Sequence, residues 1–250
     1  MSAPETLEGW FALHDLRCLD RAAWGALPSN ERSKAVAEAT DLLLAFERVV
    51  DAPTGRSVTY SVIGHKADLL MLHLRPEATQ LHELERSFGQ TALASYTNRP
   101  FSYLSVTELS RHGAPEGTAV NIEDSPYVQA RLYPEVPSHN EYVCFYPMSK
   151  KREGADNWYS LSATERGDLM RAHGRTGRRY AGQVTQIVTG SMGLDDWEWG
   201  VTLFSDDPLQ FKKLVSDMRF DEVSARFAEF GPFYVGRRLR PENLGRFLGE

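Results

Sequence analysis

Residues 64–69 read GHKADL, and residues 193–198 read GLDDWE. Each stretch is a turn that leads into an apolar strand, and the two occupy matching places in an approximate internal repeat. Outward from these turns, each half of the chain shows the order strand, helix, strand, strand, helix, strand. Two copies of this order predict duplicated ferredoxin-like repeats, an α+β fold with helices on one face of an antiparallel sheet.

The expected elements follow from hydrophobic periodicity and turn residues. In the first half, strands are expected over residues 9–14, 57–64, 68–74 and 101–108, and helices after residues 27–32 and over residues 77–88. In the second half, strands are expected over residues 142–147, 184–189, 197–204 and 233–237, and helices open at residues 161–166 and 206–208. Ser162 and Glu165 predict a capping box at the first of these helices.

The two repeats are expected to form one domain rather than two separate ones. We place them at approximately residues 7–111 and 140–240, within a single domain of 250 residues. The stretch between them, residues 112–137, is rich in Pro, Glu and Ser and is typical of a linker. Two such repeats facing each other predict a closed dimeric α+β barrel within one chain.

Composition narrows the class of protein. A net charge of −6 and a pI near 5.7 argue against a nucleic-acid binder, which usually carries a basic face. The two cysteines, Cys18 and Cys144, form no Cys-x-x-Cys pair, as is typical of a reducing compartment. Residues 1–8 do not resemble a secretory signal, and no apolar run is long enough to cross a bilayer. We therefore expect a cytoplasmic protein with no membrane partner.

Several motif classes are absent from the sequence. There is no His-Glu-x-x-His, no spaced His/Cys cluster and no Cys-x-x-Cys-His, so zinc and covalently attached haem are unsupported. Neither a P-loop nor a Gly-x-Gly-x-x-Gly occurs, so nucleotide chemistry has no support. The acidic turn at residues 195–198 is interpreted as solvated rather than as a cation site.

His173 differs from the other six histidines by its place in the repeat. On the helix expected after Ser162, Leu169 and Met170 lie one turn before it on the same side. Aligning the two repeats puts Ala39 at the matching position, so the fold itself does not require a histidine there. A lone histidine on an apolar helix face is ordinarily a core residue; the asymmetry between the repeats adds weight to a ligand role and makes His173 a candidate.

Residues 146–150 read YPMSK. Side chains two residues apart in extended backbone share a face, so Tyr146, Met148 and Lys150 are expected to point the same way. Pro147 cannot donate to a sheet, which predicts a strand end or an edge. A tyrosine and a lysine facing a cavity can bind a carboxylate beside an oxidisable phenol. On spacing alone, a surface tyrosine with a solvated basic run is the simpler interpretation.

Four more polar residues interrupt stretches that we interpret as apolar strands or their flanks. They are Arg131, Gln186, Arg219 and Ser224. Each is individually interpreted as solvated or capping. Together with Lys150 they offer two guanidinium groups, an ammonium, an amide and a hydroxyl for an anionic ligand, because charge-assisted bonds to carboxylates are the strong ones.

Several segments resemble the coproheme decarboxylases, a branch of the chlorite dismutase-like family of dimeric α+β barrel proteins. The matching segments are residues 146–152, 157–159, 173–174, 193–200 and 218–224. The likeness extends from residues 7–10 to residues 233–236, and the motifs occur in consecutive order. The resemblance therefore covers nearly the whole chain and implies a single chlorite dismutase-like domain.

The resemblance implies a role for each candidate residue. His173 would be the axial ligand of the porphyrin iron, Tyr146 the residue that forms a radical after peroxide oxidises the iron, and Lys150 the neighbour of a reacting propionate. The other implied substrate-binding residues are Arg131, Ser224 and Arg219 at propionates, Gln186 on the distal side of the ring, and Met148, Pro147 and Ser149 lining the pocket.

The implied reaction converts iron coproporphyrin III, or coproheme III, into haem b with hydrogen peroxide, turning two propionates into vinyl groups. The iron porphyrin is then both substrate and redox cofactor. Gln186 stands where chlorite dismutases carry a distal arginine, which argues against efficient chlorite chemistry and leaves the distal proton acceptor unassigned. The resemblance also implies a homopentamer and a transient contact with coproporphyrin ferrochelatase. The alternatives are a haem peroxidase or weak chlorite dismutase, and a non-catalytic coproheme carrier.

Overall fold

The computed structural model describes residues 5–110 and 125–250 of the chain. The chain divides into two compact units, each built from two separate stretches of sequence. Unit I comprises Met1–Gly9 and Ser105–Phe233, and unit II comprises Trp10–Leu104 and Tyr234–Glu250. Within the part of the chain that the structure describes, no helix has the length and apolar character that a membrane span requires.

Unit II is an antiparallel sheet with helices. Its strand order is β1-β3-β2-β9, and every pairing along it is antiparallel. The elements are β1 (Thr6–Leu19, from Trp10 onward), α1 (Arg21–Ala26), α2 (Ser29–Glu47), β2 (Arg56–Val62), β3 (Leu69–Arg75), α3 (Ala78–Gly89), the first part of β4 (Thr97–Ser110), β9 (Tyr234–Arg238) and α8 (Leu244–Leu248).

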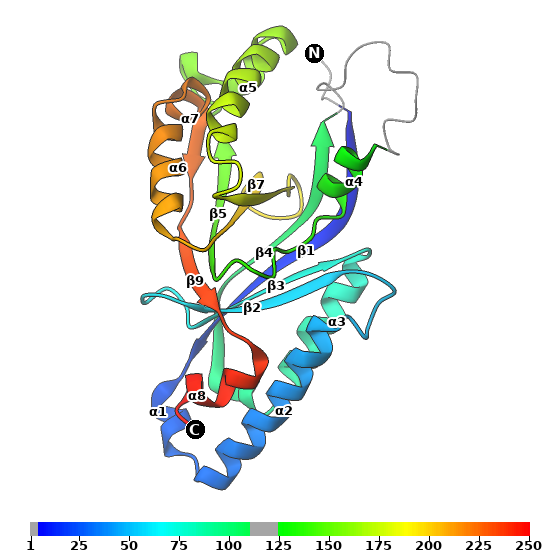
Figure 1. Cartoon of the computed structure of the whole chain (residues 1–250), viewed down its shortest axis with the longest axis vertical. Helices are drawn as coiled ribbons and strands as arrows, with labels where there is room; N and C mark the ends of the chain where they lie inside the picture. The colour runs from blue at the N-terminus through cyan, green and yellow to red at the C-terminus, as the bar shows by residue number, and fades with distance from the viewer. Residues whose placement is uncertain (1–4, 111–124) are drawn as a thin grey trace. The chain divides into compact units, whose positions relative to one another are not determined.

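Helices α2 and α3 lie against strands β2 and β3 (Figure 1). Their side chains supply much of the apolar core of unit II. On α3, Leu81, Leu84 and Phe88 are buried, and their i, i+3, i+7 spacing puts them on one face of the helix. The helix opens with a capping box, in which the Gln80 side chain accepts a hydrogen bond from the backbone N–H of Glu77 at 3.0 Å. The same spacing of apolar residues that predicted this helix from the sequence also gives it a buried face.

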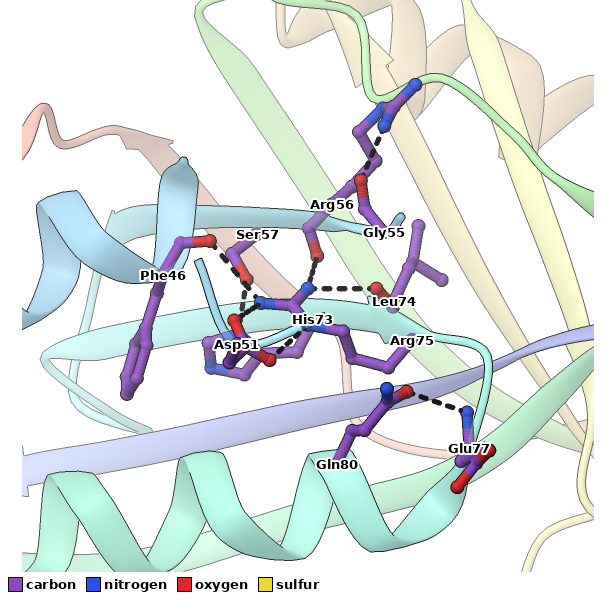
Figure 2. A network of polar contacts seen from close by, with 10 residues as sticks. All are labelled: Phe46, Asp51, Gly55, Arg56, Ser57, His73, Leu74, Arg75, Glu77 and Gln80. Atoms are coloured by element: carbon purple, nitrogen blue, oxygen red, sulfur yellow. Dashed lines mark hydrogen bonds and ion pairs between the residues drawn. The ribbon is translucent and has the colours of Figure 1, made fainter. Parts of the chain in front are cut away.

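A buried arginine ties the loop after α2 to the sheet of unit II (Figure 2). Arg75 is fully buried, and its Nε and Nη2 atoms donate to the two carboxylate oxygens of Asp51 at 2.7 and 2.8 Å. Its remaining N–H groups donate to the carbonyl oxygens of Arg56, Leu74 and Phe46. Burial of a guanidinium is tolerable when each donor has an acceptor, and here each has one.

Two histidines are also buried in unit II, on neighbouring strands. His14 lies on β1 and His73 on β3, and the Ser57 hydroxyl contacts Nδ1 of His73 at 2.8 Å (Figure 2). Burial lowers the pKa of both imidazoles to about 3, with a further contribution from charged neighbours. Both rings are therefore neutral in the folded protein at ordinary pH.

The strands of unit I also pair in antiparallel fashion. The end of β4 pairs with β6, β6 pairs with β7, β7 with β5, and β5 with β8. The elements are α4 (Pro126–Leu132), β5 (Tyr142–Lys150), the single-turn 3₁₀ helices η4 (Gly154–Asp156) and η5 (Trp158–Ser160), α5 (Ala163–Arg178), β6 (Thr185–Gly190), β7 (Trp199–Ser205), α6 (Leu209–Arg219), α7 (Glu222–Phe227) and β8 (Ala228–Phe230).

Three helices of unit I, α5, α6 and α7, lie side by side (Figure 1). The predicted capping box of α5 is present, with the Ser162 hydroxyl accepting from the N–H of Glu165 at 3.2 Å and the Glu165 carboxylate accepting from the N–H of Ser162 at 2.8 Å. Unlike the other long helices, α5 buries none of its 16 residues. About half of its residues are partly buried, and among them Leu169 packs against Trp158, Val223 and Phe227.

The α+β order that the sequence predicts is present in both halves. The chain runs β1-α2-β2-β3-α3-β4 and later β5-α5-β6-β7-α6-β9. The compact units, however, do not coincide with the expected repeats, because β9 pairs with β2 in unit II and the end of β4 pairs with β6 in unit I. Of the expected linker at residues 112–137, the first part lies outside the described residues, and α4 occupies part of the remainder.

Candidate active site

Every candidate site residue lies in unit I, and the strand register places several of them on one face of its sheet. β5 continues through Lys150, so Tyr146, Met148 and Lys150 share a face, as their spacing predicted. Directly opposite residues in antiparallel strands also share a face, and Tyr146 is opposite Val201 of β7. Two residues further along β7, and therefore on the same face, Leu203 is opposite Gln186 of β6.

Gln186 therefore lies on the face that carries Tyr146. The two residues lie on the two strands that flank β7, which are about 10 Å apart at the usual strand spacing, and they are offset by two positions along the strands. Gln186 is exposed, so its amide is available to a ligand on this face. The sheet joins these two distant segments because both strands pair with β7, a pairing that local sequence patterns do not encode.

Pro147 was expected at a strand end or edge, and this expectation is wrong. It lies inside β5, opposite Gly200 of β7. Its carbonyl oxygen accepts from the N–H of Gly231 at 2.9 Å, so the nitrogen and carbonyl of Pro147 face away from β7. The missing N–H therefore costs no hydrogen bond to β7, which is why the sheet tolerates proline here.

The Tyr146 phenol is buried in an aromatic pocket. Its ring stacks on Phe233 with 4.4 Å between centroids and lies 5.8 Å from the ring of Phe230. Among the described residues, none forms a hydrogen bond with its hydroxyl. Burial raises the pKa of the phenol above its usual value, and Arg219, whose guanidinium lies 3.8 Å from the Phe230 ring centroid, partly opposes that shift. The phenol is thus kept protonated.

Lys150 ends β5, and its side chain is largely buried. Its Nζ atom lies 4.6 Å from the ring centroid of Trp158, and no hydrogen bond or ion pair reaches it from the described residues. Burial lowers the pKa of Lys150 to about 8, while Asp221 and Glu198 oppose the shift. A buried cation without a bonded carboxylate is costly unless a ligand completes its environment.

His173 has a carboxylate partner that fixes its tautomer. Its Nδ1 atom lies 2.7 Å from Oδ1 of Asp221, the N-cap residue of α7. Because a carboxylate only accepts, Nδ1 carries the proton of the neutral ring, and Nε2 is left with a lone pair. The side chain is 29% exposed, so Nε2 can be reached. This arrangement, with one ring nitrogen bonded to a carboxylate, is usual for a metal-ligating histidine.

The neighbours of His173 on α5 differ from the expected apolar face. Leu169 packs against the cluster of Trp158, Val223 and Phe227, whereas Met170 is 45% exposed. The packing of Leu169 fixes the helix one turn before the histidine. His173 itself is not a core residue, which removes the ordinary interpretation of a histidine on this face.

Three of the polar candidates lie on helices rather than in or beside strands, which corrects the expected setting. Arg131 is on α4, Arg219 is the last residue of α6, and Ser224 is buried on α7. Ser224 lies three residues after Asp221, so the helix cap that holds His173 also places this hydroxyl. No contact joins Arg131 to the other candidates within the described residues; its helix is fixed by the bond from the Thr107 hydroxyl to the Leu132 carbonyl at 2.6 Å.

Asp221 is the residue of the candidate site to which the sequence reasoning gave no role. It was quoted within residues 218–224 but given no role. A usable signal exists, because an aspartate directly before a helix is a typical N-cap, and this one accepts from the N–H of Val223 at 3.2 Å. That its other function is to bind His173, 48 positions away, is visible only in three dimensions.

This fold and donor set place the chain in a known class. The model of the chlorite dismutase family matches residues 21–239, and the chain belongs to that family. A solved chlorite dismutase from Candidatus Nitrospira defluvii, in complex with imidazole, is 20% identical, covers 96% of each chain and has a TM-score of 0.77. This likeness confirms the predicted α+β fold.

Two further comparisons are more specific. A coproheme decarboxylase from Thermus thermophilus is 52% identical over 244 residues, which is 98% of this chain and 96% of that protein. A solved structure described as a novel haem-binding protein, also from Thermus thermophilus, is 50% identical, covers all of both chains and has a TM-score of 0.92. The chain is therefore similar over nearly its whole length to a protein named as a coproheme decarboxylase and to one described as haem-binding.

Proposed function

We propose that this chain is a coproheme decarboxylase that converts iron coproporphyrin III into haem b with hydrogen peroxide. The observation that carries the proposal is the His173–Asp221 pair, which leaves Nε2 of a partly exposed imidazole open to a ligand. The name of the Thermus relative supports the substrate. A single proximal histidine is also a common way for a protein to hold the iron of a porphyrin.

The residues fit the substrate by their chemistry. His173 would bind the iron through Nε2, and Asp221 would keep the imidazole oriented and electron-rich. The propionates are carboxylates, and Lys150 and Arg219 offer cationic donors near Tyr146 and Asp221. Further contacts to the porphyrin are assigned to Arg131, Ser224, Gln186, Met148, Pro147 and Ser149.

Tyr146 is the proposed reactive side chain. Its ring is packed against Phe230 and Phe233, and its protonated hydroxyl has no hydrogen-bond partner among the described residues, so loss of a hydrogen atom would leave a radical within this aromatic pocket. This radical would take a hydrogen atom from the β-carbon of a propionate, restoring the phenol. Loss of one more electron and of carbon dioxide then leaves a vinyl group.

The overall reaction balances for each propionate. One propionate, one hydrogen peroxide and one proton give one vinyl group, one carbon dioxide and two waters. The iron, when bound, supplies the oxidising power that peroxide brings. The chain's part is to anchor the carboxylates, hold the phenol at the reacting carbon and exclude water.

We also propose that the chain assembles as a homopentamer and contacts coproporphyrin ferrochelatase transiently, in the cytoplasm. These proposals rest on the family resemblance. Sedimentation of the purified protein tests the first, and a size increase on mixing with the ferrochelatase tests the second.

The decisive experiment adds iron coproporphyrin III to the purified apoprotein and titrates hydrogen peroxide. Mass spectrometry should show two successive losses of one carboxyl group each, ending at haem b. If coproheme binds but its mass does not change, the chain is a carrier and the proposal is wrong. If peroxide is consumed with a reducing dye while the porphyrin stays intact, the peroxidase alternative is correct.

A further inference from the structure

Residues 157–159 read NWY and belong to the segments that carry the family resemblance, yet none of the roles above uses them. The segment is pinned beside the end of β5. The Asn157 side chain accepts from the N–H of Tyr159 at 3.0 Å, and the N–H of Trp158 donates to the carbonyl of Lys151 at 3.0 Å. The N–H of Lys151 in turn donates to the carbonyl of Phe227 at 2.8 Å. The indole of Trp158 is thus held in one place.

The buried indole lies where three functional elements meet. It packs with Val223 and Phe227 of α7, and Leu169 of α5 contacts the same cluster. The rings of Trp158 and Phe227 meet edge-on, with centroids 5.4 Å apart and planes at 62°. The ammonium of Lys150 at the end of β5 lies over the indole. One ring therefore touches the strand of Lys150, the helix of Asp221 and, through Leu169, the helix of His173.

The charged groups that face Lys150 are already engaged elsewhere. Asp221 binds His173, and Glu198 accepts from the backbone N–H of Lys150 at 2.7 Å. Burial and Glu198 raise the pKa of the Tyr159 phenol, and Glu198 also lies 4.0 Å from the guanidinium of Arg152. Both carboxylates act on the Lys150 ammonium only at longer range.

We infer that Trp158 is a positioning residue, whose indole face holds the Lys150 ammonium in place and favours its charged form. A cation–π contact is electrostatic and uses none of the three N–H donors of the ammonium. Those donors are then left for an anion, which on the proposed function is a propionate of the substrate. An ion pair with a protein carboxylate would occupy them instead.

Lysine reactivity in the apoprotein tests this inference without any porphyrin. Only the neutral amine reacts with acetic anhydride, so the pH dependence of acetylation reports the pKa of each lysine. Fragment-ion mass spectrometry separates Lys150 from the exposed Lys151, which serves as the internal reference. Three variants are compared with the parent chain: Trp158→Leu, Trp158→Phe and Phe227→Leu.

Trp158→Leu should lower the pKa of Lys150 by about one unit, because the ring quadrupole that favours the cation is removed. Trp158→Phe, which keeps an aromatic face, should show a smaller decrease. Phe227→Leu disturbs the same apolar cluster but keeps the indole, so the pKa of Lys150 should not change. Lys151 should titrate alike in all four proteins.

Two outcomes overturn the inference. One is an unchanged pKa of Lys150 in Trp158→Leu, and the other is an equal decrease in Phe227→Leu, which would assign the effect to packing. Where circular dichroism shows that Trp158→Leu does not fold, the comparison of Trp158→Phe with Phe227→Leu decides in the same way. Failure of the parent chain to decarboxylate coproheme would instead contradict the proposed function and leave this comparison intact.

Discussion

The two units bury charged side chains in opposite ways. In unit II the guanidinium of Arg75 is fully enclosed by Asp51 and three carbonyl oxygens, so all of its donors are used. In unit I the ammonium of Lys150 and the phenol of Tyr146 are buried, yet within the described residues neither side chain has a hydrogen-bonding partner. A completed network stabilises a fold, whereas side chains without hydrogen-bonding partners keep their polar atoms available to a ligand.

The largest effect should follow from removing the unpaired phenol. Tyr146→Phe deletes one buried oxygen and keeps the stacking on Phe233, so binding of iron coproporphyrin III should persist. Decarboxylation should fall by at least about 10²-fold, because no phenol remains to carry the radical. The rate of carboxyl loss is measured by mass spectrometry. Tyr142→Phe, on the same strand, is the matched control, and normal turnover of Tyr146→Phe would exclude the proposed radical site.

Removing the guanidinium of Arg75 from its network in unit II should lower the stability of the protein without changing a residue of the candidate active site. Arg75→Met leaves Asp51 and the carbonyl of Leu74 without their donor, and should lower the free energy of unfolding by about 3–5 kcal/mol. Urea denaturation measures the change. Arg86→Met breaks an exposed pair with Glu83 and should cost less than about 0.5 kcal/mol. If the free energy of unfolding fell equally in the two variants, the buried network would contribute no more to stability than the exposed ion pair, and the prediction would be wrong.

The buried histidines of unit II predict a pH dependence of stability. The folded pKa values of His14 and His73 are lowered to about 3, so the unfolded chain takes up protons first as pH falls below about 6.5. Stability is therefore fully present above that pH and is lost progressively between about 6.5 and 3. At pH 5 the loss should be about 2 kcal/mol per histidine.

Denaturant unfolding at pH 7 and pH 5 measures this loss. His73→Leu should reduce the difference between the two pH values, whatever it does to stability at pH 7. An undiminished difference would mean that other groups cause the acid sensitivity.

The smallest effect concerns the carboxylate behind His173. Asp221→Asn keeps an N-cap for α7 but removes the charge, so affinity for iron porphyrin should fall by about 10- to 100-fold. Absorbance titration with the porphyrin measures it. Asp20→Asn makes the same change at the N-cap of α1 in unit II and should leave the affinity as it was. Unchanged affinity in Asp221→Asn would show that the carboxylate does not affect how tightly His173 binds the iron porphyrin.

The sequence predicts the positions of helices and strands better than it predicts which strands pair with one another. Alternation and capping signals place β5, α5 and α6 within a few residues, because these signals are local. The pairing of β5 and β6 with β7, which puts Gln186 on the face of Tyr146, depends on contacts between distant strands. Pro147 was expected at a strand end or edge and instead lies inside β5. The missing N–H of a proline disrupts a sheet only where a neighbouring strand would accept a hydrogen bond from it. Arg131 was assigned to a strand because its apolar neighbours fit either element.

The same limit applies to the site. His173, Tyr146 and Lys150 were identified by repeat asymmetry, spacing and resemblance. Their partners Asp221 and Trp158 were present in quoted segments, but nothing local shows which side chains they contact. Interactions across 48 positions of sequence, as between His173 and Asp221, follow from packing and not from pattern.

The return of the chain's last strand to unit II has a consequence for synthesis on the ribosome. Unit II is complete only when Tyr234–Glu250 has emerged, although the rest of it ends at Leu104. At ordinary translation rates that interval is roughly 7 to 30 seconds. During this time β2 lacks the neighbour that β9 provides and presents an open sheet edge. The nascent chain is then most exposed to aggregation, and a premature stop before residue 234 would make that exposure permanent.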